Sequence, residues 1–349
     1  MSKKNKNIVF LTPGFPESEN DSTTIPALQI FLKSLRSALP DANLTLITFQ
    51  FPHTNKSYNW HGIEVIPLNG QGKKLNKLWT WKKALKTLQK LHKSQKIDTI
   101  HSFWIGECTT IGERFAKKRA INHVVTVMGQ DATVANFHAK KLMNSKAKIV
   151  TLSKNHHLEL FKTYNLESII IPWHLHVTEF PELQNNNIDV LGVGSLNSIK
   201  NYSNFIDVIS ALKKKHSNLK VCIIGEGKLQ NTLEFKVKNL GLDNTITFLG
   251  KLSRTEVLQT MAQSNILLHT SLFESFGFVF LEALYSGMQI ASYNVGLAKP
   301  SLLWKVCNTK NELTKACEEL LLFPNNKKKR TLLGSEKKTI NSYLALYNE

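Results

Sequence analysis

Two glutamates eight positions apart, Glu274 and Glu282, lie in the segment ESFGFVFLE and have the clearest potential for chemistry. The apolar run Asn265–His269 predicts a buried strand, and the apolar spacing after Gly277 predicts a helix that begins near that residue. Glu274 would then lie in the loop between strand and helix, and Glu282 one to two turns into the helix. The unpaired amides at the helix start carry partial positive charge that suits a phosphate or a developing anion.

A carboxylate can accept one hydrogen bond on each oxygen, which suits the neighbouring hydroxyls of a ribose or a hexose. Hydroxyl recognition beside phosphate recognition indicates a nucleotide sugar as ligand. The alternative is that Glu274 caps the helix and Glu282 is solvated. The apolar context FVFLEALY around Glu282 favours a functional role, because an unpaired acid in such a helix would be costly.

Strands that alternate with helices must position these residues, and the alternation predicts an α/β fold with parallel sheets. Pro172, Pro181 and the polar run at 184–187 interrupt the alternation. We therefore predict two doubly wound, Rossmann-like domains at 1–180 and 181–332, and a C-terminal helix at about 333–349 that can pack back on the first. The predicted strands cover residues 8–11, 44–49, 97–100, 123–127, 148–152, 168–171, 189–193, 219–224, 245–249, 265–269 and 289–292.

The motif Glu274-Ser275-Phe276-Gly277 followed by Glu282-Ala283 resembles the ESFGxxxxEA pattern of glycosyltransferase family 4, the retaining enzymes of GT-B fold. GVGSLNSIKN, at 192–201, resembles the phosphate-loop region of that family. The resemblance implies two domains that face each other across a cleft. It also implies sugar transfer from a nucleotide-diphosphate sugar, held by the second domain, to a glycan or lipid-linked acceptor, held by the first. Such a reaction serves polysaccharide or glycoconjugate synthesis.

Carried over residue by residue, the resemblance implies catalytic roles for Glu274, on the hydroxyls of the donor sugar, and for Lys200, on the diphosphate. Glu282 would bind the ribose hydroxyls. Without the motif, Lys200 would be interpreted as a solvated lysine at a helix start. The other donor-binding residues that the resemblance implies are Ser275, Phe276, Gly277, Phe278, Gly14 and Leu252.

The sequence departs from the family pattern at Ser195, where the family usually has an arginine, and at Met128, where it often has a histidine. Arg254 or Lys228 could replace the missing cation, although nothing in the sequence shows it. His101, at a predicted strand end, is a candidate to replace the histidine, and a purely structural hydrogen bond is the alternative. Two further residues, Gln130 and Asp131, are candidate contacts of the sugar or acceptor.

Lysine and arginine outnumber aspartate and glutamate by 45 to 26, which gives a net charge of +19. Nine lysines and no acid occur within residues 73–96, and the apolar residues recur at helical spacing. We predict a basic amphipathic helix that contacts an anionic membrane surface, with Trp79 and Trp81 at the headgroups. The alternative is that its apolar face packs on the protein core.

Neither an Asp-x-Asp triplet nor a His/Cys cluster with metal-ligand spacing occurs in the sequence, so we expect no metal and no cofactor beyond the co-substrate. Four widely spaced cysteines and a short apolar run after the basic N-terminus predict a cytoplasmic protein, which could lie peripherally on the cytoplasmic face of the membrane. No nucleic-acid partner is expected. Three alternatives stay open: a sugar-nucleotide epimerase of GT-B shape, a basic nucleic-acid-binding protein and a catalytically silent scaffold.

Overall fold

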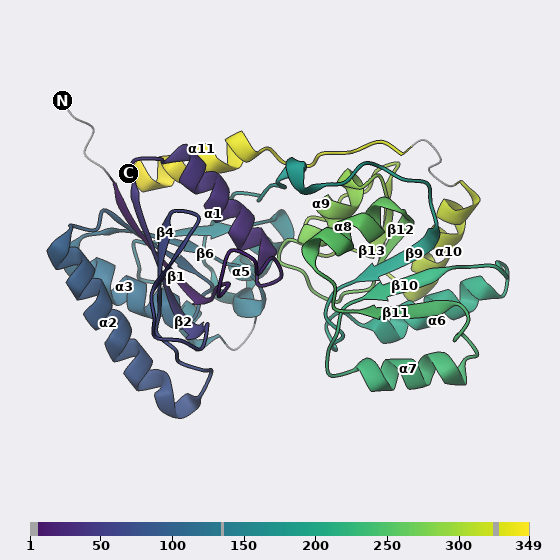
Figure 1. Ribbon diagram of the computed structural model, residues 1–349, viewed down its shortest axis with the longest axis horizontal. Helices are drawn as coiled ribbons and strands as arrows, with labels where there is room; N and C mark the ends of the chain where they lie inside the picture. Colours follow the sequence, from purple (N-terminus) through teal and green to yellow (C-terminus); the bar gives the residue numbers. More distant parts are fainter. Residues whose placement is uncertain (1–5, 134–135, 324–327, 349) are drawn as a thin grey trace. The chain divides into compact units, whose positions relative to one another are not determined.

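The computed structural model describes residues 6–133, 136–323 and 328–348, and its contacts divide the chain into two compact units. The first unit comprises 1–174 and 334–349, and the second comprises 175–333. Each unit is an α/β domain built on one largely parallel sheet, which confirms the predicted fold class (Figure 1). The sequence analysis placed the domain boundary at 180/181. The ends of the two predicted domains, residues 1–5 and 349, lie outside the described part of the chain.

The first unit has an eight-stranded sheet in which all neighbours are parallel except β3 and β4. Its strands, in spatial order, are β3 (Tyr58–Trp60), β4 (Ile63–Pro67), β2 (Asn43–Phe51), β1 (Asn7–Gly14), β5 (Thr99–Phe103), β6 (Asn122–Thr126), β7 (Lys148–Thr151) and β8 (Ile169–Ile170). The helices are α1 (Pro26–Ala38), α2 (Lys77–Ser94), α3 (Glu107–Arg119), α4 (Phe137–Lys140), α5 (Lys154–Tyr164) and α11 (Glu336–Asn348), with short 3₁₀ turns η1 (Lys74–Asn76) and η2 (Gln130–Ala132).

The central strands of this sheet are buried on both faces, as parallel strands covered by helices must be. In β1 the residues from Ile8 to Leu11 are at most 3% exposed. The β3–β4 hairpin was not predicted. Its turn places His61 and Gly62 at φ 45° and 78°, and the Asn59 side chain accepts the amide of Gly62 at 2.9 Å.

The C-terminal helix α11 belongs to the first unit and packs against α1 and β6. Tyr343 is fully buried, and its hydroxyl contacts the Thr126 hydroxyl at 3.0 Å and the Trp173 indole nitrogen at 3.1 Å. Its ring also packs on Phe31 of α1, with centroids 4.6 Å apart. Residues separated by more than 200 positions therefore complete one core.

The second unit has a six-stranded, all-parallel sheet: β11 (Ile246–Gly250), β10 (Val221–Ile224), β9 (Ile188–Val193), β12 (Ser264–His269), β13 (Gln289–Tyr293) and β14 (Trp304–Cys307). Its helices are α6 (Tyr202–Lys213), α7 (Gln230–Asn239), α8 (Arg254–Ala262), α9 (Phe278–Tyr285) and α10 (Lys310–Leu322), and η3 (Val177–Glu179) precedes β9. Apolar clusters line both faces of the sheet. The carboxyl ends of neighbouring parallel strands meet at one edge, where the loops can form a site. Within the described residues, no helix is long and apolar enough to cross a bilayer.

Candidate functional site

The loop after β9 brings Lys200 to the carboxyl edge of the second sheet. The Asn197 side chain accepts the amides of Ile199 and Lys200 at 3.1 and 3.0 Å, which turns the chain into α6. Gly225, after β10, has φ 137°, and a Cβ there would lie 2.0 Å from the carbonyl oxygen of Gly194. The two loops touch because these positions carry no side chain.

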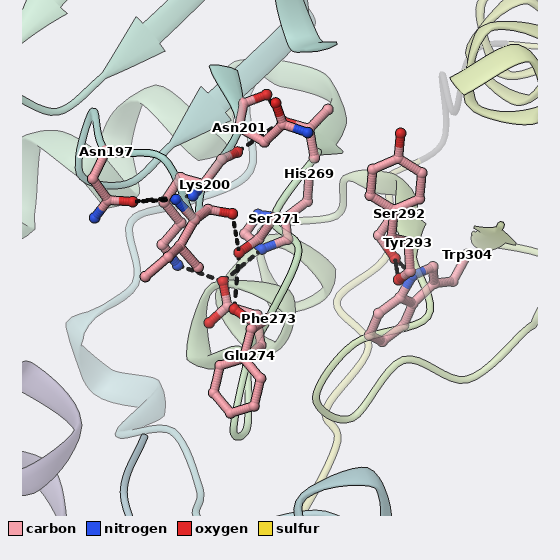
Figure 2. A network of polar contacts seen from close by, with 12 residues as sticks. Asn197, Lys200, Asn201, His269, Ser271, Phe273, Glu274, Ser292, Tyr293 and Trp304 are labelled. Atoms are coloured by element: carbon pink, nitrogen blue, oxygen red, sulfur yellow. Dashed lines mark hydrogen bonds and ion pairs between the residues drawn. The ribbon is translucent and has the colours of Figure 1, made fainter. Parts of the chain in front are cut away.

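The loop after β12 is fastened to the loop that carries Lys200. The Thr270 hydroxyl donates to the carbonyl of Lys200 at 3.0 Å, and the Leu272 amide donates to that of Ile199 at 2.8 Å. Figure 2 shows the result: the ammonium of Lys200 meets the carboxylate of Glu274. The predicted pair of catalytic residues therefore forms a direct ion pair.

His269, at the end of β12, completes this cluster. Its Nε2 lies 2.9 Å from Oε1 of Glu274 and must be the donor, because an ionised carboxylate only accepts. Burial lowers the pKa of His269, so the ring is neutral near pH 7. Sequence analysis missed this residue, although it ends the very strand that leads into the Glu274 loop.

Glu274 is held in its ionised form. Burial would raise its pKa, but the hydrogen bond from His269 and the charge of Lys200 outweigh burial and hold the pKa at about 2. Near neutral pH this carboxylate can accept hydrogen bonds from hydroxyls, and it cannot donate a proton.

From Glu274 the chain runs through a glycine-dependent turn into α9, which begins where the sequence predicted. Gly277 precedes the helix at φ 78°, and a Cβ there would lie 2.5 Å from the Phe280 ring. Gly296 packs equally closely, because its Cβ would lie 2.4 Å from the carbonyl oxygen of Phe276. In the first turn of α9 the amide of Phe280 donates to the carbonyl of Gly277 at 2.9 Å. The helix start that follows the Glu274 loop carries partial positive charge.

Glu282 lies on α9 and is paired with Arg254 of α8. Nη1 of Arg254 is 2.5 Å from Oε1 of Glu282, and its Nε is 2.6 Å from Oε2 of Glu179 in η3. The side chains of Arg254 and Glu282 are only 11% and 9% exposed. Burial raises the pKa of Glu282, as does the nearby Glu179, while Arg254 opposes both. Oε2 of Glu282 has no hydrogen bond to a described residue, so it could accept a ligand hydroxyl.

Arg254 pairs with Glu282 and Glu179 through Nη1 and Nε, while its Nη2 is buried without a hydrogen-bond partner among the described residues. Its role as a replacement for the arginine that the family pattern has at position 195 stays a prediction. Ser195 is exposed in the loop after β9, and Lys228 is exposed in the loop after β10. The sequence analysis missed the pairing of Arg254 with Glu282. It could have been inferred from the apolar helix around Glu282, because a buried acid requires a cation beside it.

The structure thus brings together the predicted residues of the second unit around one loop and helix. Ser275 and Phe278 are partly buried, and Phe276 and Gly277 are buried in the turn itself. The Arg254 guanidinium lies 5.9 Å from the centre of the Phe278 ring. Leu252 lies just before α8 and packs in the apolar cluster behind it.

The prediction for His101 was wrong. The residue lies in the middle of β5, is 0% exposed, and uses both ring nitrogens within the first unit. Nδ1 contacts the Tyr347 hydroxyl at 2.7 Å, and Nε2 contacts the Thr126 hydroxyl at 2.8 Å. A side chain in this position cannot reach a sugar or acceptor, so the structural alternative holds.

Asp131, Gln130 and Gly14 lie in loops of the first unit. Burial raises the pKa of Asp131 to about 6, while backbone amides, including those of Ile105 at 2.7 Å and Gly129 at 2.6 Å, donate to its carboxylate. Asp131 thus ties together the loops that follow β5 and β6. Gln130 is exposed at the start of η2, and Gly14 ends β1. In the described part of the chain, no three His, Cys, Asp or Glu side chains gather as a metal would need.

Comparisons with known proteins show which proteins this chain is similar to. Residues 178–302 match the model of the glycosyl transferases group 1. An uncharacterized glycosyltransferase of Methanocaldococcus jannaschii is 26% identical over 332 residues, which cover 90% of this chain and 89% of the relative. An N-acetyl-D-galactosaminyltransferase of Campylobacter jejuni, named for a diNAcBac-PP-undecaprenol substrate, is 36% identical over 97 residues, 28% of this chain and 26% of the relative's length.

Solved structures share the fold. Sucrose-phosphate synthase from Thermosynechococcus elongatus superposes with a TM-score of 0.76 at 13% identity, over 99% of this chain and 97% of that one. HepE of Anabaena, in complex with UDP and glucose, superposes with a TM-score of 0.67 at 16% identity, over 99% of this chain and 95% of that one. The fold is therefore GT-B. With the group 1 match at 178–302, the resemblance seen in the sequence is confirmed: the chain resembles the GT-B glycosyltransferases of family 4.

Proposed function

We propose that the chain transfers a sugar, with retention of configuration, from a nucleotide-diphosphate sugar to a glycan or lipid-linked acceptor in polysaccharide or glycoconjugate synthesis. The observation that carries this proposal is the Lys200–Glu274–His269 cluster at the start of α9, with Glu282 one turn further along. The UDP and glucose bound by HepE, and the substrate named for the Campylobacter relative, support the donor and acceptor classes.

Charge is the reason for this assignment. The diphosphate gains negative charge as the glycosidic bond breaks, and the ammonium of Lys200 with the first amides of α9 would stabilise it. These groups supply positive charge without a metal or cofactor. Glu274, ionised by its partners, would orient the sugar hydroxyls, and we assign no protein nucleophile. The first unit would hold the acceptor. The unpaired thiols of all four cysteines fit a cytoplasmic location.

Calorimetry with a panel of nucleoside diphosphates tests donor binding. Lys200→Ala should lower the affinity for nucleoside diphosphates about 10- to 100-fold, which is the loss expected for one charge-assisted hydrogen bond. It should change the affinity for the free nucleoside little. Glu282→Ala should lower the affinity for both the nucleoside diphosphate and the nucleoside, because both contain the ribose. Glu319→Ala, 61% exposed on α10, is the control and should change neither. Equal affinities in all four proteins would refute the assignment.

Incubation of the best-bound nucleotide sugar with candidate acceptors tests the reaction itself. Nuclear magnetic resonance of the product should show the anomeric configuration of the donor. An inverted product would contradict retention. Conversion of the donor sugar without any acceptor would instead establish the epimerase alternative.

A further inference from the structure

The helix α2 has two unlike sides. Thr80, Ala84 and Leu88 are buried against the first unit, whereas Lys82, Lys86 and Lys90 are exposed and follow one another at helical spacing. The packing alternative therefore accounts for the inner side. It leaves the outer side, with its row of lysines, without a structural role.

Apolar side chains extend the outer side at the N-terminal end of α2. Leu75, Leu78 and Trp79 are 92%, 69% and 74% exposed, although burial would stabilise each of them. Trp81 was predicted to lie at the lipid headgroups together with Trp79. Its indole N–H instead donates to Glu107 within the first unit. Only Trp79 is presented to the outside. Adjacent exposed apolar residues of this size mark an interaction site rather than ordinary surface.

A second segment, more than 50 positions away, adds to the same surface. Lys141 lies 6.0 Å from the Trp81 ring centre and 4.6 Å from that of Phe137, which is 63% exposed. The ammonium of Lys77 also lies over the Trp81 ring, 5.4 Å from its centre. The segment around α4 therefore lies beside the start of α2. We call Leu75, Leu78, Trp79 and Phe137, with Lys77, Lys82 and Lys141, the docking surface.

Each cation of the docking surface accompanies an aromatic ring. Besides the contacts of Lys77 and Lys141, the ammonium of Lys82 lies 5.4 Å from the Trp79 ring centre. No acidic residue occurs between positions 73 and 96, where Lys77 and Lys82 lie. The acid nearby is Glu107, which accepts the indole N–H of Trp81. Aromatic rings prefer the headgroup level of a bilayer, leucines enter the acyl boundary, and lysines attract anionic lipids. All three kinds of group stand together here.

We propose that the docking surface binds the face of an anionic lipid bilayer, with Trp79 at the headgroup level. The charge alone would also suit a nucleic acid. The leucines favour the lipid, because aliphatic side chains neither stack on bases as aromatic rings do nor bind phosphates. This inference stands apart from the proposed reaction, since it needs neither donor nor acceptor.

Flotation of the full chain with vesicles tests the proposal. Vesicles that contain phosphatidylglycerol should carry the protein upward, and pure phosphatidylcholine vesicles should not. Binding should weaken as salt rises, because lysine–lipid attraction is screened. One lysine near an anionic surface contributes about a fivefold factor, so Lys82→Glu/Lys86→Glu should reduce the bound fraction at least about tenfold. Trp79→Ser/Leu78→Ser should reduce it at unchanged charge.

The second unit offers a matched control, because Phe235 is 65% exposed on α7 and Lys238 is exposed nearby. Phe235→Ser/Lys238→Glu should leave flotation unchanged. Tryptophan emission should shift to shorter wavelength on vesicle binding in the wild type but not in Trp79→Phe. Equal loss in the control, flotation without the shift, or binding to single-stranded DNA and not to vesicles would overturn the proposal. Circular dichroism of every variant checks that loss of binding is not loss of folding.

Discussion

Replacement of Arg254 by methionine would leave the carboxylate of Glu282 buried without its cation. The two side chains are 11% and 9% exposed, so solvent would compensate little for the loss. Removal of one partner from a buried ion pair costs about 3–5 kcal/mol, and Glu179, which would lose Arg254 but keep its 4.0 Å contact with His176, adds repulsion. We therefore expect Arg254→Met to destabilise the packing of α8 against α9 by this amount at pH 7.

The destabilisation caused by Arg254→Met should decrease as the pH falls. In the variant, burial and Glu179 still raise the pKa of Glu282, and the opposing effect of Arg254 is gone. A carboxyl whose folded pKa is raised destabilises the fold most when it is ionised. The penalty is therefore largest at neutral pH and shrinks as the pH falls toward 4.5, the ordinary pKa of the group.

Hydrogen exchange of peptides from α8 and α9, measured at pH 7 and pH 5, reports the local free energy of opening. Lys215→Met is the matched control, because it breaks an ion pair with Glu318 in which Lys215 is 65% exposed. That change should cost less than about 1 kcal/mol at either pH. Arg254→Met/Glu282→Gln should recover part of the loss. An Arg254→Met deficit no larger than that of the control, or one that is equal at both pH values, would refute the argument.

Three further outcomes follow from the same geometry. Glu274 should contribute about 3 kcal/mol of stability that is complete above pH 4.5 and disappears as the pH falls toward 2, because its folded pKa is about 2. Urea unfolding of the wild type and Glu274→Gln should therefore converge over this range; parallel profiles would contradict the ion pair. Gly277→Ala should slow sugar transfer and cost about 1–2 kcal/mol, since its Cβ would collide with Phe280 at φ 78°, whereas Gly72→Ala, with open space around it, should leave transfer unchanged. Tyr343→Ala should lower the thermal stability of the first unit by about 3–5 kcal/mol and Tyr343→Phe by much less; equal losses would mean that the hydroxyl contacts outweigh packing.

Periodicity was enough to find the strands that are buried on both faces, because such strands are nearly continuous apolar runs. The same pattern placed Glu274 in the loop before α9. It missed β3, β4 and β14, of which β3 and β14 lie at the edges of their sheets. None of the three is a continuous run of buried residues, so the apolar pattern of a strand covered on both faces is lacking.

Side-chain partners across the fold were not predictable in this way. His101 has the right residue type at a strand of the right sheet, but α11 covers it from more than 200 positions away. The helix pattern of α11 does not say which strand it will cover. The partner of Glu282 could be inferred as a cation, whereas its identity as Arg254 depends on how α8 and α9 pack.

Glu274 and Glu282 are already paired with cations, Lys200 and Arg254, before any ligand binds. Under the proposed function, a diphosphate must therefore share Lys200 with Glu274 rather than find an unpaired charge. An ammonium has three N–H donors, so two remain for phosphate oxygens after the bond to Glu274. Ser195 can add only a neutral hydroxyl where an arginine would add a bidentate cation. Most of the diphosphate binding energy must then come from Lys200 and the amides of α9, which makes Lys200 the position where a single substitution should weaken donor binding most.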